Sequence, residues 1–253
     1  MHLSSWGEGP AVLAVHGTGT SSRFFEAARD RISPEVTVLA PDRQGWGSSP
    51  SPEDYRRTSI AEQAIAVLAS IEGMPHGSGS LAVVGEGLGA VVALEIALSR
   101  PDLVSTVGMI DPTILGLLTG ATEGVSTDGE LVREAVESGG AEAAYRLFLS
   151  GGLETLGAGA GRLGELADRG PPAPRSFLVE LPAVPAWSLD PARFDDLQAR
   201  VLLVSLGDSP ELLREAADSL VERVPRAERL DLAATGAEAI GEVFSLLLGP
   251  RPA

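Results

Sequence analysis

The fold of this chain is decided by the stretch Leu81-Ala82-Val83-Val84-Gly85-Glu86-Gly87-Leu88-Gly89-Ala90-Val91-Val92. Its first four residues are apolar, which is typical of a short strand buried in a sheet. A turn with a glycine at every second position follows, and small or apolar residues then continue to Ser99 as expected for a buried helix. Because glycines keep side chains out of a tight turn, this stretch predicts a strand, a sharp turn and a helix in direct succession.

The length and composition around this stretch predict one globular domain. The 253 residues suffice for a single domain with an inserted subdomain. Hydrophobic residues make up 44% of the chain, which is enough for a full core and too much for a disordered protein. The net charge of −16 repels nucleic acid and anionic lipid. We therefore expect no nucleic-acid partner and no membrane partner.

The residue types that are missing narrow the chemistry. All 19 basic residues are arginines, so no lysine can form a Schiff base or serve a P-loop. The chain has no cysteine, which excludes disulfides, thiolate catalysis and zinc–sulfur sites. We expect no metal and no other cofactor. The N-terminus has no signal-peptide pattern and the chain has no membrane-spanning apolar run, which predicts a cytoplasmic protein. A composition rich in Ala, Gly and Arg without Lys is typical of GC-rich bacteria.

Apolar runs on both sides of the decisive stretch predict further strands. These strands are expected at 11–15, 36–40, 104–110, 201–206 and 227–232. Helices are expected between them, at about 21–31, 58–71, 90–99, 210–221 and 237–248. The alternation of strand and helix indicates an α/β fold, with a mostly parallel sheet flanked by helices.

Residues 113–198 interrupt this alternation. They contain no convincing buried strand, and their helical patterns are separated by segments rich in glycine and proline. An irregular loop of this length would be unusual inside a compact domain. We therefore predict a helical cap at 113–198, inserted into a core domain formed by residues 1–112 and 199–253.

Four features, in this order along the chain, resemble the α/β-hydrolase superfamily. They are His16-Gly17 after the first long strand, Asp42-Arg43-x-Gly45-x-Gly47-x-Ser49 after the next, the frame Gly85-x-Gly87-x-Gly89, and the cap before Val201. The glycine frame has the shape of the nucleophile elbow, Gly-x-Ser-x-Gly. The resemblance covers nearly the whole chain. It implies an α/β-hydrolase fold with its pocket at the carboxyl ends of the strands.

Two of the three catalytic residues that the resemblance implies are absent. Gly87 stands at the position of the nucleophilic serine, and Ala237 stands at the position of the histidine. The chain has three histidines, and none follows residue 76. The acid position is filled by Asp111 or by Asp208, and the sequence does not decide between them. The resemblance therefore argues against conventional hydrolysis by a serine, a histidine and an acid.

The oxyanion hole implied by the resemblance consists of backbone groups, which survive the loss of the serine. One N–H belongs to Leu88, directly after the elbow, and the other to Gly17 or Thr18 in the loop after the first long strand. These groups either still bind developing negative charge, or the glycines only preserve the turn. The sequence leaves both interpretations open.

Three side chains are candidates for moving a proton. Asp111 can act as an acid or base if burial raises its pKa, or it is a vestigial acid or a helix cap. His16 can act as a proton shuttle, although a histidine in this loop of the family usually fixes the loop. Glu86 follows the elbow strand, so it either reaches the pocket floor or bonds to neighbouring backbone.

Five residues are expected to border the pocket. Gly87 and Ala237 mark the two lost catalytic positions, and Trp46 follows the second long strand. Phe148 and Trp187 belong to the cap, where they either form its core or face the ligand.

The leading hypothesis is a non-hydrolytic, cofactor-independent enzyme. It would be a lyase, isomerase or cyclase acting on an apolar small molecule, such as a polyketide- or terpenoid-like intermediate of bacterial specialised metabolism. One alternative is a catalytically inactive protein that only binds its ligand. Another is an unconventional ester or thioester hydrolase in which Asp111 activates water. The expected partner is a small-molecule substrate, and the oligomeric state stays open, a homodimer included.

Overall fold

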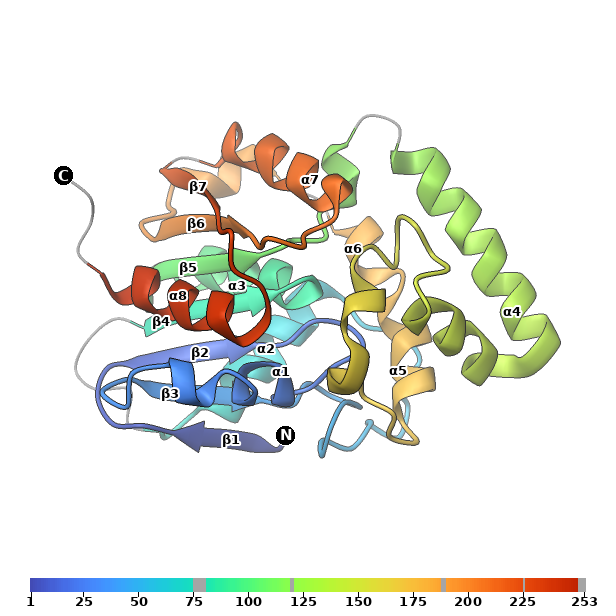
Figure 1. The fold of residues 1–253 in the computed structure, drawn as a ribbon, viewed down its shortest axis with the longest axis horizontal. Helices are drawn as coiled ribbons and strands as arrows, with labels where there is room; N and C mark the ends of the chain where they lie inside the picture. The colour runs from blue at the N-terminus through green and yellow to red at the C-terminus, as the bar shows by residue number, and fades with distance from the viewer. Residues whose placement is uncertain (75–80, 119–120, 188–189, 225, 250–253) are drawn as a thin grey trace.

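The computed structural model describes residues 1–74, 81–118, 121–187, 190–224 and 226–249. Within them a single sheet is formed by β1 (Leu3–Trp6), β2 (Ala11–Val15), β3 (Thr37–Pro41), β4 (Leu81–Glu86), β5 (Val104–Ile110), β6 (Arg200–Ser205) and β7 (Ala227–Asp231). The strand order is β1-β3-β2-β4-β5-β6-β7 (Figure 1). Strand β1 is antiparallel to β3, and the remaining pairs are parallel. This arrangement confirms the predicted mostly parallel sheet.

Helices cover both faces of this sheet. One face carries α2 (Ile60–Ser70), α3 (Leu88–Ser99) and α7 (Glu211–Val221), and the other carries α1 (Arg23–Glu26), the short 3₁₀ helix η1 (Arg29–Arg31) and α8 (Gly236–Leu248). Successive side chains of β2 point to opposite faces of the sheet. Leu13 packs with the first group of helices and Val12 with the second. Helix α3 is buried around most of its circumference, which explains why its sequence is apolar throughout.

The strand order places a crevice at the carboxyl ends of β2 and β4. From β2 the chain continues to β3 on one side, and it then returns to β4 on the other side of β2. The loops after β2 and β4 therefore diverge, and this is the position where open α/β sheets bind ligands. The loop after β2 contains His16 and Gly17, and the loop after β4 is the predicted elbow at Gly87.

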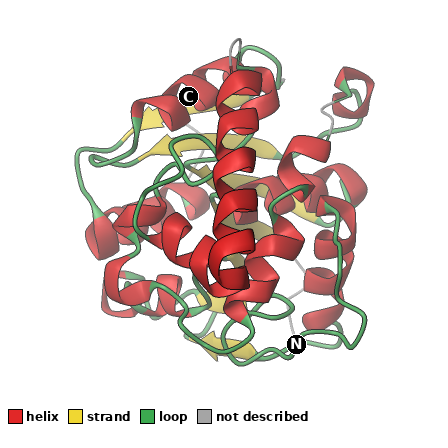
Figure 2. Cartoon of the chain, turned by 90° about the vertical axis from the view of Figure 1, so that its right-hand side faces the viewer, coloured by secondary structure: helices red, strands yellow, loops and turns green. Residues whose placement is uncertain are grey.

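The segment between β5 and β6 contains helices, and no strand in the part that the structure describes. Its elements are η2 (Leu115–Leu117), α4 (Ala121–Leu149), η3 (Ala160–Arg162), η4 (Gly164–Leu166), α5 (Ala173–Glu180), α6 (Ala183–Ala186) and η5 (Pro191–Phe194). Helix α4 departs from helical geometry at Gly139 and Gly140, where Gly140 has φ 69°. Figure 2 views the molecule from this side, with helices in front of the strands. None of the helices in the described ranges has the length and hydropathy of a membrane span.

This helical segment has an aromatic core of its own. The rings of Phe148 and Phe177 lie 4.8 Å apart between centroids, and Tyr145 lies 5.8 Å from Phe177. Trp46, from the loop after β3, is buried in the same cluster. The segment is therefore packed as a unit above the carboxyl ends of the strands, and it rests on the core through Trp46.

Candidate functional site

The turn between β4 and α3 has the backbone of a nucleophile elbow without the nucleophile. Gly87 has φ 56° and ψ −120°, a conformation that other residues rarely adopt. The flanking glycines are required by packing. A Cβ on Gly85 would lie 2.1 Å from the carbonyl oxygen of Gly89, and a Cβ on Gly89 would lie 2.1 Å from that of Val15. A Cβ on Gly87 would meet nothing closer than 3.9 Å, so a side chain at this position is missing although space for it exists.

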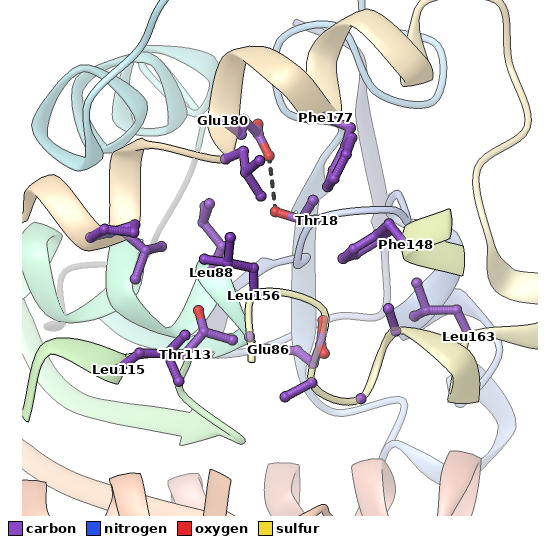
Figure 3. Close-up of a pocket in the computed structure, with 17 residues that line it drawn as sticks. Thr18, Glu86, Leu88, Thr113, Leu115, Phe148, Leu156, Leu163, Phe177 and Glu180 are labelled. Atoms are coloured by element: carbon purple, nitrogen blue, oxygen red, sulfur yellow. Dashed lines mark hydrogen bonds between the residues drawn. The ribbon is translucent and has the colours of Figure 1, made fainter. Parts of the chain in front are cut away.

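A cavity of about 60 Å³ lies over this turn (Figure 3). The core domain and the cap both contribute to its wall, which includes Thr18, Gly87, Leu88, Phe148, Leu163 and Phe177. Because a water molecule occupies roughly 30 Å³ of liquid, the cavity as it stands admits only a few non-hydrogen atoms.

Two buried polar atoms in this cavity have no hydrogen-bond partner among the described residues. They are Oε2 of Glu86 and Oγ1 of Thr113. An unpartnered buried polar atom costs on the order of 1–3 kcal/mol, so such atoms gather where a ligand or a water molecule completes the hydrogen bonding. Thr113 was not predicted from the sequence. Its position two residues after Asp111, at the carboxyl end of β5, is the signal that could have identified it.

The Glu86 carboxyl group lies against the loop after β2. A Cβ on Gly17 would lie 2.1 Å from Glu86 Oε2, so the close approach depends on glycine at position 17. Burial raises the pKa of Glu86 to about 7, and the Asp111 charge acts in the same direction; the Arg162 charge, a hydrogen bond with the Gly17 backbone and the Arg43 charge act in the opposite direction. A carboxyl group with this pKa can take up and release a proton near neutral pH.

The substitution Glu86→Gln is expected to stabilise the fold at high pH. The folded-state pKa of about 7 lies above the ordinary value of 4.5, so the folded state binds more protons between these values and stability falls as pH rises through them. Above about pH 7, ionisation of Glu86 therefore lowers the free energy of unfolding by on the order of 3 kcal/mol. Glutamine does not ionise, so the variant keeps this stability. Urea unfolding at about pH 5 and about pH 8 should show a much larger gain at the higher pH. An equal effect at both pH values would contradict the assignment.

Asp111 is the buried acid at the end of β5, and both of its carboxylate oxygens are engaged. Ser209 donates to Oδ1 at 2.5 Å, and Arg162 of the cap donates to Oδ2 at 2.8 Å. Arg162 also contacts Asp208 at 3.3 Å, and the Asp208 side chain is 46% exposed against 1% for Asp111. Asp111 also has φ 46°. These contacts hold the carboxylate in place and leave it less available for the proton transfer expected of it.

Ser209 supports Asp111 from the loop before α7. Its hydroxyl accepts from the N–H of Leu206 and donates to Asp111, and α7 begins after Pro210. Ala237, at the lost histidine position, borders a second cavity of about 90 Å³ that Asp111 and Arg162 also line. The guanidinium of Arg162 thus contacts the acid beside the space that a histidine at position 237 would enter.

His16 lies outside both cavities and fixes the loop after β2. The backbone N–H of Arg43 donates to Nε2 at 2.9 Å, and Nδ1 donates to the carbonyl oxygen of Gly17 at 2.8 Å. Burial and the Arg43 charge lower the pKa of His16 well below its ordinary value, against the effect of the bond to Gly17. A buried, neutral ring with both nitrogens engaged agrees with the structural alternative and not with a proton shuttle.

The two predicted pocket tryptophans lie elsewhere. Trp46 donates its indole N–H to Glu180 at 2.8 Å inside the cap core, and Trp187 donates to Glu95 at 3.0 Å beside α3. Neither residue lines the elbow cavity or the cavity at Ala237. A buried indole N–H needs an acceptor, and these acceptors are distant in sequence. Phe148 does line the elbow cavity.

Glu180 of α5 connects the cap to the core domain. Its carboxylate is fully buried and pairs with Arg43 at 2.5 Å and 3.2 Å. It also accepts hydrogen bonds from Trp46, from Gln63 at 3.0 Å and from the hydroxyl of Thr18 at 3.1 Å. Thr18 lines the elbow cavity (Figure 3), so this network links the cap directly to the wall of the site. Glu180 was not predicted from the sequence.

The predicted oxyanion residues divide into two groups. Leu88 and Thr18 line the elbow cavity, and the N–H of Leu88, the first residue of α3, has no acceptor within the helix. Gly17 faces the Glu86 carboxyl group instead. Within the described ranges no group of three or more His, Cys, Asp or Glu residues is placed to hold a metal ion.

The parallel sheet, the elbow and the overlying cap define the class of the protein, and a family comparison agrees. Residues 12–237 match the model of the alpha/beta hydrolase family. The chain therefore belongs to this family.

Two curated relatives are hydrolases by name. Lipase LipV of Mycobacterium tuberculosis is 31% identical over 140 residues, which are 54% of this chain and 47% of the relative. The 2-(acetamidomethylene)succinate hydrolase of Mesorhizobium japonicum is 32% identical over 114 residues, which are 45% of this chain and 39% of the relative. The chain thus spans less than half the length of these relatives.

Solved structures share the fold over nearly the whole chain. An alpha/beta hydrolase from Sphaerobacter thermophilus has a TM-score of 0.73 and 20% identity, with 98% of this chain and 96% of that chain covered. MenH from S. aureus has a TM-score of 0.72 and 14% identity, with 98% and 97% covered. At these identities the likeness concerns the fold alone.

Proposed function

We propose that this chain is a non-hydrolytic enzyme on the alpha/beta hydrolase scaffold, and that Glu86 is its proton-transfer residue. The observation that carries the proposal is the unpartnered Glu86 carboxyl oxygen, buried beside an elbow that lacks a nucleophile. Asp111 was another candidate for moving a proton. The contacts of Asp111 with Ser209 and Arg162 favour Glu86 instead.

The proposed reaction is an isomerisation or elimination next to a carbonyl group. The Glu86 carboxylate removes a proton from the carbon beside the carbonyl, and the C–H electron pair moves into the carbonyl group to form an enolate. Backbone N–H groups at Leu88 and Thr18 and the Thr113 hydroxyl are available to bind the enolate oxygen. Glu86 then returns the proton to another carbon atom of the enolate. Alternatively, the enolate electron pair forms a C=C bond while a leaving group departs from the adjacent carbon with its own bonding pair and takes the proton from Glu86. Neither route needs a covalent intermediate.

The wall of the cavity supports an apolar substrate. Most of its side chains are aliphatic or aromatic, such as Leu115, Phe148 and Leu156. A small molecule of the polyketide or terpenoid type has the required apolar surface together with a carbonyl group. A cap that closes over the substrate would strengthen hydrogen bonds to developing charge.

Mass spectrometry of candidate substrates tests this proposal. A panel of lactones, esters, thioesters and enolisable ketones of this type is incubated with the protein. We expect products whose mass is unchanged, or lowered by the departing group. A gain of one water by the substrates as a class would overturn the proposal.

A ligand-binding protein without turnover is the second candidate. It is favoured by the engagement of Asp111 and by the neutral, fully bonded ring of His16, because neither then serves as a base. A ligand that raises the melting temperature yet is recovered unchanged after long incubation would support this alternative. The third hypothesis, hydrolysis by water that Asp111 activates, meets the difficulty that both Asp111 oxygens already accept hydrogen bonds.

Restoring the lost residues is expected to create esterase activity only when Arg162 is also removed. In the variant Gly87→Ser, Ala237→His, the new histidine must compete with Arg162 for Asp111. Adding Arg162→Ala frees the acid, and hydrolysis of p-nitrophenyl butyrate should rise at least about tenfold over the double variant. The new serine adopts a left-handed conformation at a cost of about 1–3 kcal/mol, so melting temperatures are compared. Equal activity of Gly87→Ser alone and the triple variant would contradict this prediction.

A further inference from the structure

The cavity at Ala237 is separate from the elbow cavity but adjoins it. The two have Glu86, Gly159 and Leu163 in common, so Glu86 stands between two lobes of one site. The lobe at Ala237 has a volume of about 90 Å³ and the elbow lobe about 60 Å³. Nothing in the proposed proton transfer uses the space at Ala237.

The size of this lobe limits what can occupy it. A cavity of about 150 Å³ holds benzene, so a lobe of about 90 Å³ accepts a group of roughly three or four non-hydrogen atoms. Its apolar wall is formed by side chains such as Phe24, Leu206 and Ile240. Such a wall favours the methylene or ring carbons of a ligand.

Most of the charged residues that line this lobe carry carboxyl groups, which accept hydrogen bonds. Glu86, Asp111 and Asp208 contribute three carboxyl groups, and Arg162 contributes the one guanidinium in the lining. Arg162 is already paired with Asp111 at 2.8 Å and with Asp208 at 3.3 Å, whereas Glu86 Oε2 has no partner in the described part of the protein. An anionic group would therefore meet two paired carboxylates and the Glu86 carboxyl group, of which Oε2 has no partner in the described residues. A hydrogen-bond donor with a positive charge complements them.

We propose that the lobe at Ala237 binds a small cationic nitrogen group of the substrate, such as a primary ammonium on a short carbon chain. This inference deepens the proposed function and rests on its claim that the elbow site binds a small molecule. The ammonium group would lie against Glu86 and Asp111, and its carbon chain would contact the apolar wall. The carbonyl end of the same substrate would occupy the elbow lobe.

A matched set of three fragments tests this inference without any turnover. Propylammonium, propanol and propionate have nearly the same size and carry positive, zero and negative charge at about pH 8. Binding is followed by NMR titration of the intact protein. We expect propylammonium to bind at least about tenfold more tightly than propanol, which corresponds to about 1.4 kcal/mol, and propionate to show no saturable binding.

Two variants locate the binding. Ala237→Leu fills the lobe and should weaken propylammonium binding at least about tenfold, whereas the matched variant Ala158→Leu, which fills the elbow lobe only, should leave it unchanged. Asp208→Asn removes one carboxylate at an exposed position and should weaken binding even if Ala237→Leu does not fold.

Equal binding of propanol and propylammonium, or propylammonium binding that survives both Ala237→Leu and Asp208→Asn, would overturn the inference. Because no turnover is measured, such a failure would leave the proposed chemistry of Glu86 untouched.

Discussion

Replacing Glu86 by glutamine is expected to reduce turnover by about 10²- to 10⁴-fold, the usual contribution of a positioned acid or base. Glutamine preserves the size and polarity of the side chain but cannot carry the proton. The KM should change little, because the cavity keeps its shape and the amide can still form hydrogen bonds. Stability is not the cause of the loss, since this substitution is expected to stabilise the fold at high pH.

The pH profile separates a role in proton transfer from a structural role. In the direction that begins with proton removal, kcat/KM of the wild type should rise as pH increases through about 7, the value to which burial raises the pKa of Glu86. This limb should vanish in Glu86→Gln. Glu238→Gln is a suitable control, because Glu238 lies exposed in the first turn of α8 and lines neither cavity. Turnover of Glu86→Gln within about threefold of the wild type would exclude the proposed role.

Replacing Glu180 by alanine is expected to destabilise the protein by about 3–5 kcal/mol, because the substitution leaves the buried charge of Arg43 without its partner. Both side chains are fully buried, so solvent cannot compensate. The indole N–H of Trp46 and the side-chain amide of Gln63 would lose an acceptor as well. Urea unfolding of wild type and variant at neutral pH measures the difference.

A double variant distinguishes the broken pair from lost packing. Replacing both partners, as in Arg43→Met with Glu180→Leu, removes the two charges together and should recover most of the stability that Glu180→Ala loses. Because Glu180 also binds the Thr18 hydroxyl at the cavity wall, limited proteolysis should cut the cap of Glu180→Ala faster than that of the wild type. A loss below about 1 kcal/mol in Glu180→Ala, or an intact cap, would contradict this account.

The sheet was predictable from local patterns. The strands β2 and β4 are mostly apolar runs, whereas the parallel edge strand β7 is largely polar. The elbow glycines at 85 and 89 are imposed by backbone contacts that only glycine permits. The helix expected at about 58–71 is present as α2, and its start is fixed by a local contact, the capping box of Ser59 with Glu62. Strand β1 was missed because its sequence, Leu3–Trp6, is short and half polar, as suits an edge strand that only one neighbour covers.

The site was less predictable, because its decisive contacts join residues that are far apart in the sequence. Glu86 was identified from its place after the elbow strand. The partner of Asp111 in the cap, Arg162, follows it by 51 positions, and Glu180 follows Arg43 by 137. No periodic pattern marks either pair. The same reason explains the wrong prediction for Trp46. Its place in the loop after β3 suggested that it lines the pocket, but its indole N–H donates to Glu180 in the cap core.

The most direct test of the central claim is to follow the origin of oxygen in the product. A substrate found by the mass-spectrometric screen is turned over in water enriched in oxygen-18, by the wild type and by Glu86→Gln. We predict that the wild-type product contains no oxygen from the solvent at the reacting carbonyl carbon, and that Glu86→Gln forms this product at least about a hundredfold more slowly. A carboxylate product that carries solvent oxygen, formed at the same rate by both proteins, would contradict the account and identify a hydrolase.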